Sequence, residues 1–427
     1  MTTASTTRVS LLTPVGRGAV ATVAIHGPNA TDAANQFFHP FGKTQLPRAK
    51  VNRILFGYFR IDDDKAGEEV VACRTSDEEV EIHCHGGRAA AERILRAFYE
   101  AGCVCVDWRD AARATDDTLI AEARIALAAA RTQRVAGVLL DQYRGTLGRE
   151  IERITASLQE AEATVEASRA LDALLARSDF GMRLTEPWRI AVIGQPNVGK
   201  SSLVNAIVGF SRSIVFQQPG TTRDVVTVET AIDGWPVELR DTAGIREGGD
   251  EIEQQGIERA EQQRQSADLV MLVCDASRPL SAADFALADD LSDPLWIYNK
   301  SDLADAGQCR LLHPPSGRVG RGSGRGGLLE TGSNSRFPLP ARSSRPSRRE
   351  GEFKGECHWT SAMTGQGIDA LLSAISTRLV PNAPLPKTPV PFSQRQIELL
   401  TTAKAALPND KSTAVAALTQ LVSPESI

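Results

Sequence analysis

The sequence predicts an α/β protein with three parts: a small α/β domain, a helical domain, and a phosphate-binding domain inserted into the helical one. The clearest observation is Gly194-Gln195-Pro196-Asn197-Val198-Gly199-Lys200-Ser201, a phosphate-binding loop between an apolar strand and a helix. Residues 111–178 hold almost no glycine or proline and repeat apolar residues at three and four, which is typical of packed helices. In the first hundred residues, short alternating segments predict strands around two helices.

At 427 residues the chain is long enough for two or three domains, and a hydrophobic fraction of 42% is ordinary for a globular protein. No apolar run approaches the length of a membrane-spanning helix, and the first residues lack the apolar core of a signal peptide. Seven cysteines, an odd number, are scattered singly, which favours free thiols in a reducing compartment. We therefore expect a cytoplasmic protein with no membrane partner.

The first domain is expected to cover residues 1–108. Strands are predicted at 9–12, 20–25, 54–61, 69–73 and 79–87, and helices at 31–38 and 88–101. In Glu79-Val80-Glu81-Ile82-His83-Cys84-His85, polar and apolar residues alternate, which predicts a strand with one buried face. A metal site of His83, Cys84 and His85 with the segment 103–105 is the alternative, but a strand sends alternate side chains to opposite faces.

The helical domain is expected over residues 109–187 and again over residues 381–427. Its apolar stripe, on long helices, consists of Leu140, Tyr143, Leu147, Ile151, Ile154, Leu158, Ala161 and Val165. The linkers 185–187 and 381–386 are rich in proline and mark the two ends of the inserted domain. The segment Pro391–Leu407 predicts the helix with which the chain returns to the helical domain.

The inserted domain is expected to span residues 188–380. Arg189–Ile193 predicts a buried strand before the phosphate-binding loop, and residues 202–208 predict a helix after it. The glycines of the loop allow backbone N–H groups to point at phosphate oxygens. Lys200 supplies a positive charge, and the Ser201 hydroxyl can bind Mg²⁺.

Four further motifs follow along the chain: Gly220-Thr221-Thr222-Arg223-Asp224, Asp241-Thr242-Ala243-Gly244, Asn299-Lys300-Ser301-Asp302 and Thr360-Ser361-Ala362. In this order, together with the phosphate-binding loop, they resemble a translation-factor-type GTPase domain. A carboxylate at Asp302 can accept hydrogen bonds from both N1–H and the N2 amino group of guanine, and adenine offers neither donor pattern. Asn299 is expected at the other edge of the base and the Lys300 stem over its face. The backbone of residues 361–362 is expected to meet the guanine oxygen.

Residues 309–350 form an insert of unusual composition. They hold nine arginines, two glutamates and many glycines, serines and prolines, for a net charge of about +7 in a chain whose total is -5. This composition predicts a disordered, solvated insert. RNA binding and an error in the sequence are the alternatives.

Two segments of the first domain, Thr13–Ala19 and Glu79–Gly87, resemble the N-terminal domain of the tRNA-modification GTPase family MnmE (TrmE), and the nucleotide motifs fit the same family. The resemblance implies a domain that binds a tetrahydrofolate derivative. It also implies a homodimer, tRNA as the substrate, modification of the wobble uridine, and an MnmG-like (GidA) FAD-dependent partner.

The resemblance further implies how GTP is hydrolysed. The G domains are expected to dimerise across their nucleotides, and K⁺, bound by Asn197, takes the place of an arginine finger. Glu253 matches the family's water-positioning glutamate, and Gly244 senses the γ-phosphate. The implied catalytic residues are Lys200, Thr222 and Glu253, with Ser201, Thr222 and Asp241 serving Mg²⁺ and Asn197 serving K⁺. The implied nucleotide-binding residues are Gly194, Asn197, Val198, Gly199, Lys200, Ser201, Ser202, Thr221, Thr222, Asp241, Gly244, Asn299, Lys300, Asp302, Ser361 and Ala362.

The chain departs from the family's pattern in three places. The segment Asp107–Arg113 stands where the family has an Arg-Ala-Phe-Leu-Asn-Gly-Lys-like run, and the helical domain is shorter than usual. No cysteine follows Cys357, so the family's closing Cys-x-Gly-Lys motif has no counterpart. We therefore expect GTP hydrolysis without tRNA modification by this chain alone. The alternative functions are a degenerate paralogue and a regulatory GTPase of the Der or Era type, although Der has two GTPase domains and Era a C-terminal RNA-binding domain.

Overall fold

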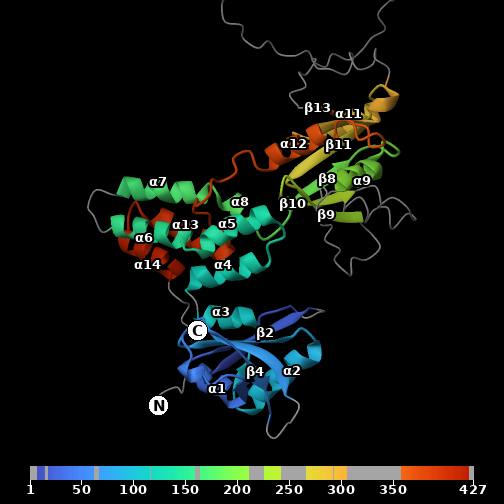
Figure 1. Ribbon diagram of the computed structural model, residues 1–427. Coiled ribbons are helices and arrows are strands. Elements are labelled where there is room, and N and C mark those ends of the chain that lie inside the picture. Colours follow the sequence, from blue (N-terminus) through green and yellow to red (C-terminus); the bar gives the residue numbers. More distant parts are fainter. Residues whose placement is uncertain are drawn as a thin grey trace, which may run out of the picture. The chain divides into compact units, whose positions relative to one another are not determined.

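Figure 1 shows the computed structural model of the chain. The structure describes residues 7–14, 18–61, 67–115, 117–158, 164–210, 226–241, 266–291, 293–304 and 357–422. The chain forms two compact units, one of Met1–Glu186 with Pro384–Ile427 and the other of Pro187–Ala383. The second unit is therefore a continuous segment whose two ends both connect to the first unit.

The first unit begins with a seven-stranded sheet in the order β3-β4-β5-β6-β2-β1-β7. Its strands are β1 (Arg8–Leu11), β2 (Val20–His26), β3 (Phe38–Pro40), β4 (Ile54–Phe59), β5 (Glu68–Arg74), β6 (Glu79–His85) and β7 (Val104–Cys105). All neighbours are antiparallel except β1 and β7, which are parallel. The five expected strands are confirmed, and β3 and β7 are additional strands too short for an alternating pattern to reveal.

One face of this sheet is buried against α1 (Ala30–Phe37) and α2 (Arg88–Glu100), both of which the sequence predicted. In β6, Val80 and Ile82 are fully buried in that core, whereas His83 lies on the other face, where its Nδ1 is 3.0 Å from Thr22 Oγ1. The predicted alternation is therefore confirmed. Among the described residues, no group of three or more His, Cys, Asp or Glu side chains is arranged to hold a metal ion.

The helical part of the first unit consists of short helices rather than the expected long ones. They are α3 (Trp108–Thr115), α4 (Thr118–Ala128), α5 (Gln133–Tyr143), α6 (Thr146–Leu158), α7 (Thr164–Leu175), α8 (Ser178–Met182), α13 (Gln394–Ala406) and α14 (Lys411–Val422). Gly145, at φ +83, ends the helical run after α5 and changes the direction of the chain. The predicted stripe is buried in α6 but not in its neighbours, because Tyr143 is 38% and Val165 70% exposed.

The returning segment packs against the first helical residues, as the sequence predicted. Gln142 of α5 is buried, and its side chain donates to the carbonyl of Thr388 (3.0 Å) and accepts from the N–H of Val390 (3.2 Å). Arg395 at the start of α13 pairs with Glu122 of α4 at 2.7 Å. Contacts of α13 with α7 and of α14 with α6 complete the bundle.

The second unit contains a six-stranded sheet in the order β13-β12-β11-β8-β10-β9. Its strands are β8 (Trp188–Ile193), β9 (Val226–Ile232), β10 (Trp235–Asp241), β11 (Leu269–Asp275), β12 (Leu295–Asn299) and β13 (Cys357–Trp359). Only β9 and β10 are antiparallel. The helices in the described part of the unit are α9 (Lys200–Phe210), α11 (Ala282–Asp289) and α12 (Ile368–Leu379), with the 3-10 turn η3 (Ser301–Leu303). The predicted mixed sheet flanked by helices is confirmed. The arginine-rich insert 309–350 lies outside the described residues.

Within the part of the chain that the structure describes, no helix is long and apolar enough to cross a membrane.

Candidate nucleotide-binding site

The phosphate-binding loop connects the end of β8 to the start of α9, as the sequence predicted. At Gly194 a β-carbon would lie 2.2 Å from the carbonyl oxygen of Val273, so only glycine fits beside β11. Gly199 has φ +94, and a β-carbon there would lie 2.4 Å from Asn299 Nδ2. The two glycines therefore allow the loop to lie directly against two neighbouring strands, with the N-terminus of α9 facing the loop.

Lys200 is held inside this loop. The residue is only 6% exposed, and its Nζ donates to the carbonyls of Gly194 (3.0 Å) and Gln195 (2.9 Å). The ammonium group thus lies within the concavity of the loop. A positive charge at the N-terminus of a helix is suited to an anion such as a phosphate group.

Asn299 joins the phosphate-binding loop to the guanine motifs. The residue is 1% exposed, and its Nδ2 donates to the carbonyl of Val198 at 3.0 Å. Its Oδ1 accepts from the N–H of Ala362 at 3.2 Å, and Thr360 Oγ1 is 3.4 Å away. Both polar atoms of the side chain are engaged within the protein, and the expected contact with the base stays a prediction.

The next residue, Lys300, adds a second connection. Its backbone is left-handed, at φ 63, and its Nζ lies 2.7 Å from the carbonyl oxygen of Asn197 and 2.7 Å from Asp275 Oδ2. Asp302 follows in η3 and is exposed. The loop around Ser361 is fixed by a hydrogen bond from the N–H of Ser301 to the carbonyl of Thr360.

The structure therefore brings together three of the five predicted motifs: the phosphate-binding loop, the segment 299–302 and the segment 360–362. Of a fourth motif, 241–244, the structure describes only the backbone of Asp241, which ends β10 opposite Val192 of β8, on the strand that leads into the loop. Thr221, Thr222, Gly244 and Glu253 lie outside the described residues. Sequence reasoning missed Asp275, although a carboxylate at the end of an apolar strand next to the loop was a usable signal.

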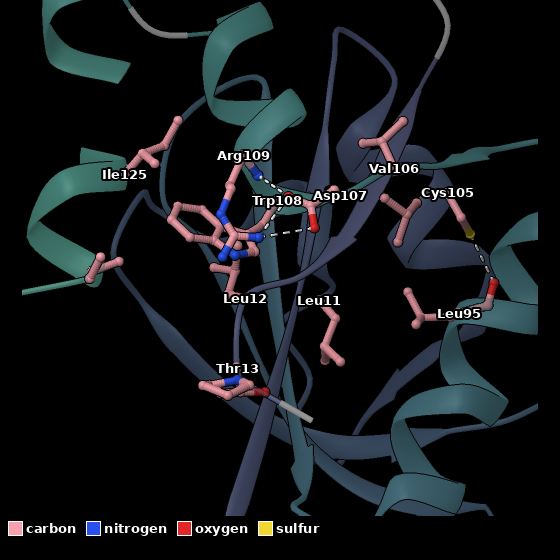
Figure 2. A pocket seen from close by; sticks show the side chains of 14 residues that line it. Leu11, Leu12, Thr13, Leu95, Cys105, Val106, Asp107, Trp108, Arg109 and Ile125 are labelled. Carbon is pink, nitrogen blue, oxygen red and sulfur yellow. Dashed lines mark hydrogen bonds and ion pairs between the residues drawn. The ribbon is translucent and has the colours of Figure 1, made fainter. Parts of the chain in front are cut away.

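The first unit contains a separate cavity of about 660 Å³ (Figure 2). Leu11 at the end of β1 and the following Leu12 and Thr13 form one wall, the start of α3 forms another, and Ile125 of α4 faces them. At the start of α3, the backbone N–H of Arg109 donates to Asp107 Oδ1 at 2.8 Å, and its guanidinium lies 5.0 Å from the centre of the Trp108 ring.

Comparison with known proteins identifies relatives of two parts of the chain. Residues 189–300 match the family described as 50S ribosome-binding GTPase, and residues 7–113 match the family described as GTP-binding protein TrmE N-terminus. The tRNA modification GTPase MnmE of Synechococcus elongatus is 32% identical over 92% of this chain and 85% of that protein. The MnmE of Bacillus velezensis is 34% identical over 70% of this chain and 73% of that protein. Among solved structures, the G domain of the T. maritima FeoB iron transporter is 21% identical, covers 45% of this chain and 99% of that chain, and has a TM-score of 0.28.

Proposed function

Because the chain belongs to the MnmE family of tRNA modification GTPases, we propose that its GTP hydrolysis depends on K⁺ held at Asn197 and on the pairing of two G domains. The chain binds GTP with Mg²⁺ and hydrolyses it. The observation that supports the finer proposal is the position of Asn197. Its carbonyl accepts the Lys300 ammonium, and its left-handed backbone exposes the side chain at the edge of the phosphate-binding loop.

The residues of the site take roles that follow from their chemistry. Lys200 neutralises phosphate charge from inside the loop, and Ser201 offers its hydroxyl to Mg²⁺. Asp302 selects guanine. For Asp241 and for the residues outside the described part we propose the roles that the family pattern implies: Thr222 with Asp241 at the Mg²⁺ ion, Thr221 and Gly244 at the phosphates, and Glu253 in positioning the attacking water.

K⁺ dependence is tested by steady-state GTP hydrolysis in K⁺ and in Na⁺ at matched ionic strength. We expect turnover in K⁺ to be at least about tenfold faster, since a cation at the transferring phosphate acts on the transition state. Asn197→Ala should remove the difference, whereas Asn205→Ala, an exposed residue of α9, should retain it. Equal rates of the unmodified protein in the two salts would rule the proposal out.

Pairing of the G domains is tested separately. We expect the sedimentation coefficient of the protein to rise when GDP, aluminium fluoride and K⁺ are added together, and not when Na⁺ replaces K⁺. Glu253→Ala should lower the turnover number while leaving GTP affinity nearly unchanged, because positioning a water acts mainly in the transition state. A sedimentation coefficient that is the same in both salts contradicts cation-dependent pairing.

The cellular role follows from the family. We propose that the chain forms a homodimer, acts on tRNA at the wobble uridine with an MnmG-like FAD-dependent partner, and works in the cytoplasm. We also propose the division into domains 1–108, 109–187 with 381–427, and 188–380. The tRNA role is tested by the wobble-uridine modification profile of tRNA from a deletion strain, with and without a plasmid-borne copy of the gene. An unchanged profile would contradict it.

We further propose that the cavity of the first unit binds a tetrahydrofolate derivative. A volume of about 660 Å³ and an apolar wall that includes Trp108 suit a flat heterocycle, and Arg109 offers a cation to a carboxylate. Titration calorimetry with 5-formyltetrahydrofolate should show binding that is lost in Trp108→Leu and weakened in Arg109→Gln. Arg113→Gln is the matched control, because Arg113 lies on the same helix and pairs with Asp110 outside the cavity. Equal heats for all four proteins would contradict the assignment.

A further inference from the structure

The carboxylate of Asp275, at the end of β11, lies beside the nucleotide site and has no role among the GTPase motifs. Its Oδ2 is 2.7 Å from Lys300 Nζ. Its Oδ1 accepts from the N–H (2.9 Å) and the hydroxyl (2.6 Å) of Ser277. The side chain is 11% exposed, so Ser277 holds one oxygen and thereby directs the other at Lys300.

Lys300 in turn links Asp275 to the phosphate-binding loop. A lysine has a flexible four-carbon stem and loses rotamer entropy when it is fixed in place. Here its Nζ is held between Asp275 and the carbonyl oxygen of Asn197, both at 2.7 Å. Lys300 and Asn197 both have left-handed backbones, at φ 63, so each stands in a conformation that its surroundings must maintain.

The charge of the carboxylate favours this arrangement. Burial opposes ionisation of Asp275, but hydrogen bonds from Lys300 and Ser277 outweigh it and lower the pKa of the carboxyl below its usual value. Asp275 is therefore ionised at neutral pH and attracts the ammonium group throughout the physiological range. The Asp275 side chain is 11% and the Lys300 side chain 32% exposed, so water screens this ion pair less than it screens a fully exposed one.

We propose that Asp275 is a positioning residue of the guanine site, which fixes Lys300 over the face of the base and, through Lys300, fixes Asn197 at the edge of the phosphate-binding loop. This inference rests on the proposed function, because it takes Lys300 as the cover of guanine and Asn197 as the K⁺ residue. It adds that nucleotide retention and the response to K⁺ are coupled through one carboxylate. Asp275 contacts neither ligand itself.

The inference is tested by the release of N-methylanthraniloyl-GDP from the full chain in a stopped-flow experiment, and by the K⁺ concentration that gives half-maximal GTP hydrolysis. Removing one partner of a shielded, hydrogen-bonded charge pair should speed GDP release about tenfold in Asp275→Ala. Asp275→Asn keeps the volume and one acceptor, so release should be about threefold faster. The half-maximal K⁺ concentration should rise in both variants, and it should rise more in Asp275→Ala than in Asp275→Asn.

The matched control is Asp293→Asn. Asp293 also pairs with a basic residue of the same unit, Arg378 at 2.6 Å, but it lies outside the nucleotide site. GDP release from this variant should equal that of the unmodified protein within about twofold. The melting temperature of each variant shows whether it is folded, and if Asp275→Ala does not fold, Asp275→Asn alone decides.

The outcomes separate this inference from the proposed function. If the unmodified protein prefers GDP to ADP but the Asp275 variants release GDP at its rate, the positioning role is wrong and the guanine site stands. If GDP release changes but the half-maximal K⁺ concentration does not, the coupling through Asn197 is wrong. If the unmodified protein does not prefer GDP to ADP, the guanine site itself fails, and the inference fails with it.

Discussion

A β-carbon on Gly199 would lie 2.4 Å from Nδ2 of Asn299, so the phosphate-binding loop and the guanine motif touch at a point where no other residue fits. The Asn299 amide uses this closeness to donate to the carbonyl of Val198. The first prediction concerns this contact. Gly199→Ala should weaken GDP binding at least about tenfold, because the left-handed backbone alone costs a non-glycine residue about 1–2 kcal/mol.

Gly209→Ala is the control for this substitution. Gly209 lies in α9, a β-carbon there meets no atom within 4 Å, and alanine favours the helix by about 0.5–1 kcal/mol. Equilibrium binding of GDP and the melting temperature are measured for both variants. If Gly199→Ala binds GDP as well as Gly209→Ala does, the close approach of the two motifs is not needed for binding.

Lys200→Ala should reduce GTP turnover at least about a hundredfold and weaken nucleotide binding, because the ammonium group lies inside the phosphate-binding loop. Turnover is measured with saturating GTP and Mg²⁺ in K⁺ buffer. Lys43→Ala, an exposed residue of the first unit, should leave turnover unchanged. Near-normal hydrolysis by Lys200→Ala would remove Lys200 from the site.

Asp302→Asn should shift nucleotide preference from GTP toward xanthosine triphosphate. In the role proposed for it, the carboxylate accepts from the two donors of the guanine edge, and the amide reverses one of these matches because it donates to the oxygen that xanthine carries there. The measurement is the ratio of the two specificity constants, with the unmodified protein given both nucleotides as the reference. A ratio that does not move would mean that Asp302 does not read the base.

The stability of the second unit should depend on pH through Asp284. Burial opposes ionisation of this carboxylate, but hydrogen bonds from Ser281 and Arg278 outweigh it, so its pKa is lower in the folded protein than in the unfolded chain. A group of this kind adds stability above its unfolded pKa, and that stability is lost as the pH falls through its folded pKa. Asp284→Asn should therefore be less stable by about 1–3 kcal/mol at pH 7.

The difference in the free energy of unfolding between Asp284→Asn and the unmodified protein should narrow as the pH falls below about 4, where the carboxyl of the unfolded chain is itself protonated. Thermal unfolding of the two proteins at several pH values measures it. Asp410→Asn serves as a comparison from the other unit. Hydrogen bonds from Ser412 and Thr413 lower the pKa of Asp410 to about 2. A difference for Asp284→Asn that is constant from pH 7 to pH 3 would contradict the linkage.

The sequence predicted the elements whose pattern is local. The alternation of β6 and the strand, loop and helix around Gly194–Ser201 follow from residues a few positions apart, and both are confirmed. The predicted apolar stripe is longer than the buried one, because Gly145 separates α5 from α6. In α5 the buried face carries Val135, Leu139 and Gln142 instead of the predicted residues. A periodic pattern alone does not show that a single left-handed glycine turns the chain.

The features that the sequence could not predict depend on contacts between distant residues. The pairing of Asp275 with Lys300 joins the ends of two parallel strands, and nothing near Asp275 indicates its partner. The cavity forms because residues after β1 face the start of α3 and α4, which lie about a hundred residues later in the chain. The side chain of Asn299 was expected at the base, and its use inside the protein depends on the close packing of the loop against β12.

The hydrogen bonds of Gln142 have a consequence for how the protein is made. Their partners, Thr388 and Val390, come 246 and 248 positions later in the chain. At roughly 5–20 residues per second, a ribosome needs about 12–50 s to reach them after it has added Gln142. During that interval the helices around Gln142 lack the segment that completes their core, while the whole second unit emerges and can fold. The helical bundle therefore stays incomplete during synthesis until its last helices have been made.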